Sequence, residues 1–188
     1  MKICELPPIA IGGLIKNNKN LYMKEKIKID IVSDVVCPWC TIGYKRLEKA
    51  ISELGIEDQV EIEWQPFELN PDMPEEGQNL TEHITQKYRS TPEQQKESQQ
   101  GMTDVGKELG FTFDYFEDMR MVNTFESHIL LGYAKEFGKQ TDLQIRLTTA
   151  FFSERKDVSN RDVLKQALLE VGLNADEALA KLDNDEAR

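Results

Sequence analysis

Two cysteines are placed where they could carry out redox chemistry. Cys37 and Cys40 enclose a Pro-Trp pair in the run DVVCPWCTIG, residues 34–43. A cysteine at the start of a helix ionises more easily, because unpaired amide groups and the helix dipole favour negative charge there. The thiolate is the reactive form in disulfide exchange. We therefore predict that Cys37 is the nucleophile and that Cys40, one helical turn later, closes or resolves the disulfide.

The same reasoning makes Cys37 the more acidic and the more exposed of the two thiols. Pro38 suits the first helical turn, where its missing amide hydrogen would be unpaired in any case. Trp39 could shape the substrate surface beside the disulfide, and a structural role fits it equally well. Cys4 has no role in this scheme.

A structural metal site and a chance pairing are the alternatives to redox chemistry. A zinc site needs about four ligands, and the other candidates, Cys4, His83 and His128, are scattered along the chain. A chance pair has no reason to fall where a strand meets a helix. We therefore expect a redox pair, without a metal or a cofactor.

The segments around the motif predict the elements that position it. KIKIDIVSDVV, residues 26–36, alternates isoleucine with polar residues and indicates a strand with one buried face. A helix is predicted from Pro38 to a stop at Gly55, and VEIEWQPF indicates a second strand ended by Pro66. Strand, helix and strand in this order form a parallel crossover unit.

Helical spacing dominates the chain after the loop at residues 68–79. Thr91, Pro92 and Glu93 read as the cap and first turn of a helix that ends near Gly110. Further helices are predicted within residues 125–138, within 143–151, within 163–172 with Ser159 as cap, and briefly after Asn174. No strand is expected between residues 120 and 172.

Composition narrows the function classes. The chain has 188 residues, 39% hydrophobic and 30% charged, and no window approaches the ~18 apolar residues of a membrane span. Its 34 acidic and 23 basic residues give a net charge of −11, which repels phosphate backbones and argues against nucleic acid as a partner. The start lacks a convincing signal-peptide cleavage site, and three cysteines suit the cytoplasm better than a disulfide scaffold.

Four blocks in order carry a family resemblance: DVVCPWCTIGYKRLEKA, WQPFELNPDMPEEG, NTFESHILLGYAKEFGKQ and FFSERKDVSNRDVLKQALLEVGL. From about Lys26 to Leu182 the chain resembles the DsbA-like thioredoxin-fold family, in its branch of FrnE-type oxidoreductases and 2-hydroxychromene-2-carboxylate isomerase relatives. The resemblance implies an α/β, thioredoxin-like fold with a large inserted helical domain. It also implies a thiol-disulfide oxidoreductase with Cys37 as attacking thiol and Cys40 as resolving thiol.

Three segments follow from this resemblance: an N-terminal extension at residues 1–25, a β-α-β part with the CPWC motif at 26–70, and a helical domain at 71–188.

By resemblance, Asn123, Thr124 and His128 border the active-site cleft and join Pro38 and Trp39 as candidate substrate-binding residues. A core-packed His128 is the competing interpretation, because it shares a predicted helix face with Phe125.

The sequence departs from the family pattern at its end. Family members continue into an antiparallel hairpin, entered by a cis-proline that faces the cysteines, and a final helix, whereas this sequence stops at LDNDEAR. The fold is therefore expected to be incomplete at its C-terminus, with residues 27–32 as an open edge. We expect either the N-terminal extension or a second copy of the chain, in a homodimer, to cover this edge.

Two other functions stay open beside disulfide exchange with protein or small-thiol partners. One is a glutathione-dependent isomerase or transferase of the 2-hydroxychromene-2-carboxylate isomerase or kappa type, whose members usually have serine where this chain has Cys37. The other is a truncated, noncatalytic remnant.

Overall fold

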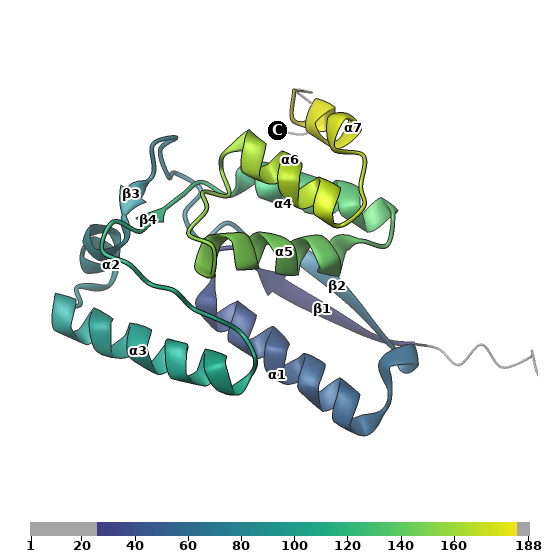
Figure 1. Cartoon of the computed structure of the whole chain (residues 1–188), viewed down its shortest axis with the longest axis horizontal. Helices are drawn as coiled ribbons and strands as arrows, with labels where there is room; N and C mark the ends of the chain where they lie inside the picture. The colour runs from purple at the N-terminus through teal and green to yellow at the C-terminus, as the bar shows by residue number, and fades with distance from the viewer. Residues whose placement is uncertain (1–25, 184–188) are drawn as a thin grey trace, which may run out of the picture.

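A two-stranded parallel sheet lies between one long helix and a group of shorter ones in the computed structural model, which describes residues 26–183 (Figure 1). The strands are β1 (Ile27–Ser33), β2 (Val60–Pro66), β3 (Gln78–Asn79) and β4 (Arg120–Met121). The helices are α1 (Pro38–Leu54), α2 (Leu80–Tyr88), α3 (Pro92–Glu108), α4 (Phe125–Glu136), α5 (Gln140–Phe152), α6 (Arg161–Glu170) and α7 (Ala175–Ala180), with short 3₁₀ turns at Glu57–Gln59 and Lys181–Asp183. The N-terminal extension and Cys4 lie outside the described residues.

The predicted crossover unit is confirmed. β1 and β2 run parallel, with Ile31 opposite Trp64, and α1 connects them. Pro38 occupies the first turn of α1, and Gly55 ends the helix with a φ of 62°, a left-handed conformation that glycine adopts without strain. The sequence around the cysteines therefore folds as its local pattern indicates.

The predicted buried face of β1 is only partly realised. Ile29 and Ile31 are half-buried, while Ile27 is 54% exposed and Val32 61% exposed. Within residues 26–183 β1 pairs with β2 along one edge, and no strand pairs with its second edge. The side chains of β1 therefore have a neighbouring strand on one side only. The expectation that another segment or another chain covers this edge stays a prediction.

The helical predictions hold, with two corrections. Thr91 caps α3, as the sequence indicated, and the structure adds Gln94, whose side chain accepts a hydrogen bond from the Thr91 amide. Asn160, rather than Ser159, caps α6, because its side chain accepts a hydrogen bond from the amide of Asp162. The expectation of no strand between residues 120 and 172 is wrong, since β4 pairs antiparallel with β3. Two residues are too few for an alternating pattern to reveal a strand.

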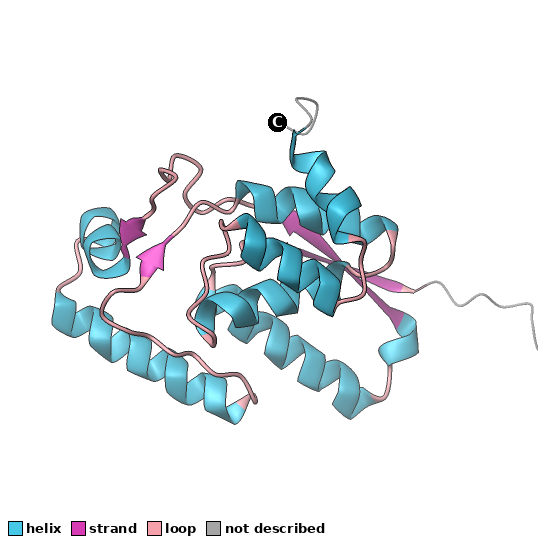
Figure 2. Ribbon diagram, turned by 45° about the horizontal axis from the view of Figure 1, so that its top comes forward, coloured by secondary structure: helices cyan, strands magenta, loops and turns pink. Residues whose placement is uncertain are grey.

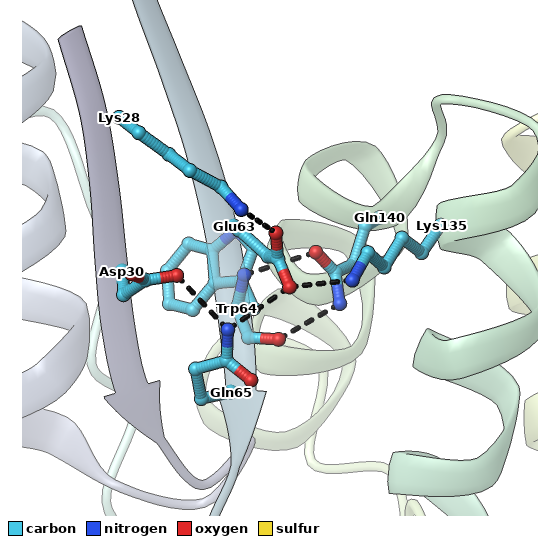
Figure 3. Close-up of polar contacts among 7 residues, drawn as sticks. All are labelled: Lys28, Asp30, Glu63, Trp64, Gln65, Lys135 and Gln140. Atoms are coloured by element: carbon cyan, nitrogen blue, oxygen red, sulfur yellow. Dashed lines mark hydrogen bonds and ion pairs between the residues drawn. The ribbon is translucent and has the colours of Figure 1, made fainter.

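Polar contacts join the helices to the outer edge of the sheet (Figure 3). Gln140, the first residue of α5, hydrogen bonds through its side-chain amide to both backbone groups of Trp64. Glu63 on β2 pairs with Lys28 on β1 and with Lys135 on α4. These contacts fix α4 and α5 against the sheet on the side opposite α1.

The elements α2, α3, β3 and β4 form a second group at one end of the molecule (Figure 2). They lie beside the N-terminal end of α1, where the cysteines are, and α3 also packs along α1. No helix in residues 26–183 is long and apolar enough to cross a membrane.

Candidate functional site

Cys37 lies at the turn where the chain leaves β1 and enters α1. Its backbone amide donates a hydrogen bond to the carbonyl of Asp34 at 3.2 Å, which tightens the turn. Its Sγ accepts a hydrogen bond from the amide of Cys40 at 3.3 Å, so the sulfur caps the helix in the way a serine or aspartate oxygen does elsewhere. A negative charge on this sulfur is therefore stabilised by an otherwise unpaired amide.

Both cysteines are free thiols, and the relative exposure predicted for them is wrong. Cys37 is 8% exposed and counts as buried, whereas Cys40 is half-buried. A position at a helix start favours exposure, but distant segments of the chain pack over this helix end.

The two thiols act as one acid with a shared proton. A hydrogen bond with the Cys37 side chain lowers the pKa of Cys40 to about 6, and Ser33 adds a smaller lowering effect. The same hydrogen bond, together with burial, raises the pKa of Cys37. The prediction that Cys37 is the more acidic thiol is therefore not supported. Each sulfur accepts a backbone hydrogen bond that stabilises its thiolate. We therefore assign the first ionisation to the pair of thiols and not to one of them.

A largely apolar cavity of about 420 Å³ opens beside Cys37. It lies between the start of α1 and the second group of elements, and Cys37 lines it while Cys40 does not. Its other lining residues include Pro38, Trp39, Tyr88, Met102, Tyr115, Met119, Met121, Phe151 and Phe152. The cavity gives a bound group direct access to one sulfur of the pair.

Pro38 and Trp39, two of the candidate substrate-binding residues, both line this cavity, and their role in binding stays a prediction. Trp39 and Tyr88 are each 62% exposed, so two aromatic rings reach the solvent from its lining. Polar lining comes from His83 and Lys87 on α2 and from Gln95 on α3. A ligand here would meet apolar side chains inside and polar or aromatic ones near the surface.

Of the three residues placed by resemblance near the cleft, none lines the Cys37 cavity. Asn123 holds the start of α4, accepting from the amide of Phe125 and donating to the carbonyl of Met73. Thr124 is buried at the beginning of the same helix. His128 is buried too, and its Nε2 lies 3.4 Å from Oδ1 of Asp34.

Sequence reasoning missed Asp34 and Tyr115 as members of this region. Asp34 is 2% exposed, and its Oδ2 accepts a hydrogen bond from the amide of Leu69. An acidic residue in a strongly apolar run just before a reactive cysteine was the available signal. Tyr115 gave no signal in sequence, and burial raises the pKa of its hydroxyl. No three acidic, histidine or cysteine side chains among the described residues cluster as metal ligands would.

Comparison with known proteins places these features in a family. Residues 28–188 match the model of the DSBA-like thioredoxin domain. The protein YwbO of Bacillus subtilis (strain 168), itself uncharacterised, is 28% identical over 148 residues, which are 79% of this chain and 68% of YwbO.

Solved structures agree with the family match. The probable DsbA oxidoreductase SCO1869 from Streptomyces coelicolor superposes with a TM-score of 0.79 at 29% identity, over 85% of this chain and 69% of that one. A 2-hydroxychromene-2-carboxylate isomerase gives 0.62 at 13% identity, over 86% and 73%, which is a likeness of fold. The predicted α/β, thioredoxin-like fold is confirmed.

Proposed function

Because the chain belongs to the DSBA-like thioredoxin domain family, we propose that it is a thiol-disulfide oxidoreductase whose Cys37 and Cys40 alternate between dithiol and disulfide. The observation that carries this proposal is the free thiol pair at the start of α1, with Cys37 facing an apolar cavity. A hydrogen bond with Cys37 lowers the pKa of Cys40 to about 6, so one thiol of the pair is ionised at neutral pH, and proton transfer from Cys37 to Cys40 moves the charge to the sulfur that faces the cavity.

The exchange runs in two steps. The Cys37 thiolate attacks one sulfur of a substrate disulfide, a mixed disulfide forms, and the other substrate sulfur leaves as a thiolate that takes up a proton. Cys40, deprotonated in turn, then attacks Cys37, so that the Cys37–Cys40 disulfide forms and the second substrate thiol leaves. Two electrons and two protons pass to the substrate, and the reverse sequence oxidises a substrate dithiol.

The geometry supports this division of roles. Only Cys37 of the two lines the cavity, so a substrate sulfur reaches it first. Cys40 lies one turn into α1, with its amide directed at the Cys37 sulfur. Thiol or disulfide partners with an apolar group next to the sulfur suit the methionine and aromatic lining. We propose the cytoplasm as its compartment, since the cysteine count is odd and small.

Trapping of the mixed disulfide tests the assignment. Cys40→Ser should accumulate a covalent adduct with a disulfide substrate such as insulin, while Cys37→Ser should form none and lose the insulin-reduction rate by about 10³-fold or more. Cys4→Ser is the matched control and should react at the wild-type rate. Adducts that form on Cys40 in Cys37→Ser would reverse the roles.

The glutathione-dependent alternative makes a different prediction. The fold shared with 2-hydroxychromene-2-carboxylate isomerase is the observation in its favour. Under that alternative the chain binds glutathione without redox exchange at the Cys37–Cys40 disulfide. Incubation of the oxidised chain with reduced glutathione, followed by mass measurement, separates the two: formation of the free dithiol or of a mixed disulfide supports the oxidoreductase.

A further inference from the structure

A hydroxyl group in the Cys37 cavity donates its proton to a weak acceptor. Tyr115, in the loop between α3 and β4, lines this cavity together with Cys37. Its hydroxyl donates a hydrogen bond to Sδ of Met102 at 3.6 Å. A thioether sulfur is a weak acceptor, so a stronger acceptor that enters the cavity can take over this hydrogen bond.

The ring of Tyr115 is held by aromatic packing and not by its hydroxyl. It stacks on Phe113 with ring centroids 6.1 Å apart and meets the edge of Phe152 at 6.3 Å. The preceding residue, Asp114, fixes the backbone, because its amide donates to the carbonyl of Phe152 and its carboxylate pairs with Arg155. The hydroxyl can therefore change its acceptor while the ring stays in place.

The Tyr115 hydroxyl keeps its proton over the pH range in which thiols exchange disulfides. Burial raises its pKa, and negative charge on Cys37 raises this pKa further. The hydroxyl is therefore a donor at neutral pH. The effect of Cys37 also indicates that charge at the cysteine and charge at the hydroxyl lie close enough to interact.

The two thiols of the motif obtain their hydrogen bonds from other groups. Sγ of Cys37 accepts from the Cys40 amide, and hydrogen bonds with Cys37 and Ser33 lower the pKa of Cys40. In the described part of the chain the hydroxyl of Tyr115 is directed at Met102 and not at either cysteine. Its proton is therefore available to a third sulfur, which a substrate would bring into the cavity.

Thiol-disulfide exchange produces such a sulfur. As the Cys37 thiolate attacks one substrate sulfur, a new S–S bond forms, the substrate S–S bond breaks, and its electron pair leaves on the second substrate sulfur. In a largely apolar cavity this developing negative charge has little solvent around it. A donor that is already in place stabilises such a charge in the transition state.

We propose that Tyr115 is a further catalytic residue, whose hydroxyl turns from the Met102 sulfur to the leaving sulfur of the substrate and donates a hydrogen bond to it as the disulfide breaks. The hydroxyl keeps its own proton, and the leaving thiolate takes up a proton from water. The inference rests on the proposed function of the two cysteines. It also assigns the substrate class, disulfides of aliphatic thiols, because their basic thiolates are poor leaving groups and gain most from a donor.

Two uncharged disulfides that differ in their leaving sulfur test the proposal. Hydroxyethyl disulfide releases a basic alkyl thiolate, whereas dithiodipyridine releases a thiolate whose charge spreads into an aromatic ring. Loss of the free dithiol is followed at pH 7 by acid quenching and mass measurement, in a Cys4→Ser background. Tyr115→Phe should slow the reaction with the alkyl disulfide by about 10-fold or more, and the reaction with the aromatic disulfide by less than about twofold. Equal slowing of both reactions, or of neither, would overturn the proposal.

The ratio of the two rates within one variant does not depend on the fraction of folded chain, so a folding defect cannot imitate the expected result. Tyr44→Phe is the matched control. Tyr44 packs against Trp64 away from the cavity lining, and its hydroxyl donates to Glu48. This variant should keep the wild-type ratio.

Thiolate absorbance at 240 nm supplies a second measurement. Tyr115→Phe should titrate with the wild-type midpoint, because the hydroxyl acts on the leaving sulfur and not on the attacking one. A raised midpoint would mean that Tyr115 stabilises the thiolate of the cysteine pair instead, which contradicts the proposal.

The outcomes separate this inference from the proposed function. A wild-type chain that reacts with neither disulfide would contradict the oxidoreductase and, with it, the role of Tyr115. Exchange by the wild-type chain, with an unchanged rate ratio in Tyr115→Phe, would contradict the role of Tyr115 alone.

Discussion

The side-chain amide of Gln140 makes the two hydrogen bonds to the backbone of Trp64 that a neighbouring strand would otherwise make (Figure 3). Nε2 donates to the Trp64 carbonyl at 2.9 Å, and Oε1 accepts from the Trp64 amide at 2.9 Å. Gln140 is 8% exposed, so these bonds are shielded from water. The first residue of α5 therefore completes the outer edge of β2 and attaches the helices to the sheet.

Gln140→Ala should lower the free energy of unfolding by about 3 kcal/mol, because it leaves a buried amide and a buried carbonyl of Trp64 unpaired. Gln166→Ala is the matched control, since that side chain is exposed on α6 and hydrogen bonds only within the helix, to Glu170. It should change stability by less than about 0.5 kcal/mol. Urea denaturation measures both, and equal losses in the two variants would contradict the role given to Gln140.

Two glycines in α3 should respond oppositely to alanine. A Cβ at Gly106 would lie 2.6 Å from the ring of Phe113 and 2.7 Å from the carbonyl of Phe111, so Gly106→Ala should destabilise the chain by about 1–3 kcal/mol. A Cβ at Gly101 meets nothing within 4 Å, so Gly101→Ala should stabilise it by about 0.5–1 kcal/mol. Thermal unfolding of the two variants compares them directly, and destabilisation by Gly101→Ala would show that the space around α3 is misjudged.

The local sequence pattern was enough to predict the strand, helix and strand that position the two cysteines. The alternation in β1, the proline after Cys37 and the glycine after α1 act on neighbours in sequence, so the β-α-β unit and the place of the cysteines could be predicted. The cap of α6 could not be fixed, because Ser159 and Asn160 are both good cap residues and their geometry decides.

The features of the site that could not be predicted depend on contacts between residues far apart in the sequence. Cys37 is buried because residues from α2, α3 and the end of α5 close over the start of α1. The contact between Asp34 and His128 joins positions 94 residues apart. A single sequence shows an acid and a histidine at these positions, and only the fold brings them together.

Glu63 should make stability depend on acid pH. Hydrogen bonds from Lys135, Lys28 and Gln65 lower its pKa from 4.5 to about 2. A lowered pKa means that the folded state favours the ionised form, so this contribution is complete above pH 4.5 and is lost as pH falls through 2. Glu63→Gln should therefore be less stable than wild type at pH 7 and should lose less stability between pH 4.5 and 2.

Denaturation midpoints measured at pH 7, 4.5, 3 and 2 test this dependence. Glu61→Gln, at an exposed position of the same strand, is the control and should follow the wild-type profile. If Glu63→Gln and wild type lose stability in parallel over the whole range, the lowered pKa of Glu63 is wrong.

The thiol pair should titrate as a unit, and removal of the Cys37 sulfur should make Cys40 less acidic. The Cys37–Cys40 hydrogen bond is the largest cause of the pKa of about 6, so absorbance at 240 nm in a Cys4→Ser background should rise with a midpoint near pH 6. Cys37→Ala deletes that bond while burial remains, and the midpoint of Cys40 should move up by at least about one pH unit, toward its ordinary value of 9.0. Ser33→Ala removes a weaker hydrogen bond to Cys40 and should produce a smaller rise. A midpoint that stays near 6 in Cys37→Ala would mean that the backbone around α1, and not the partner sulfur, is what makes this thiol acidic.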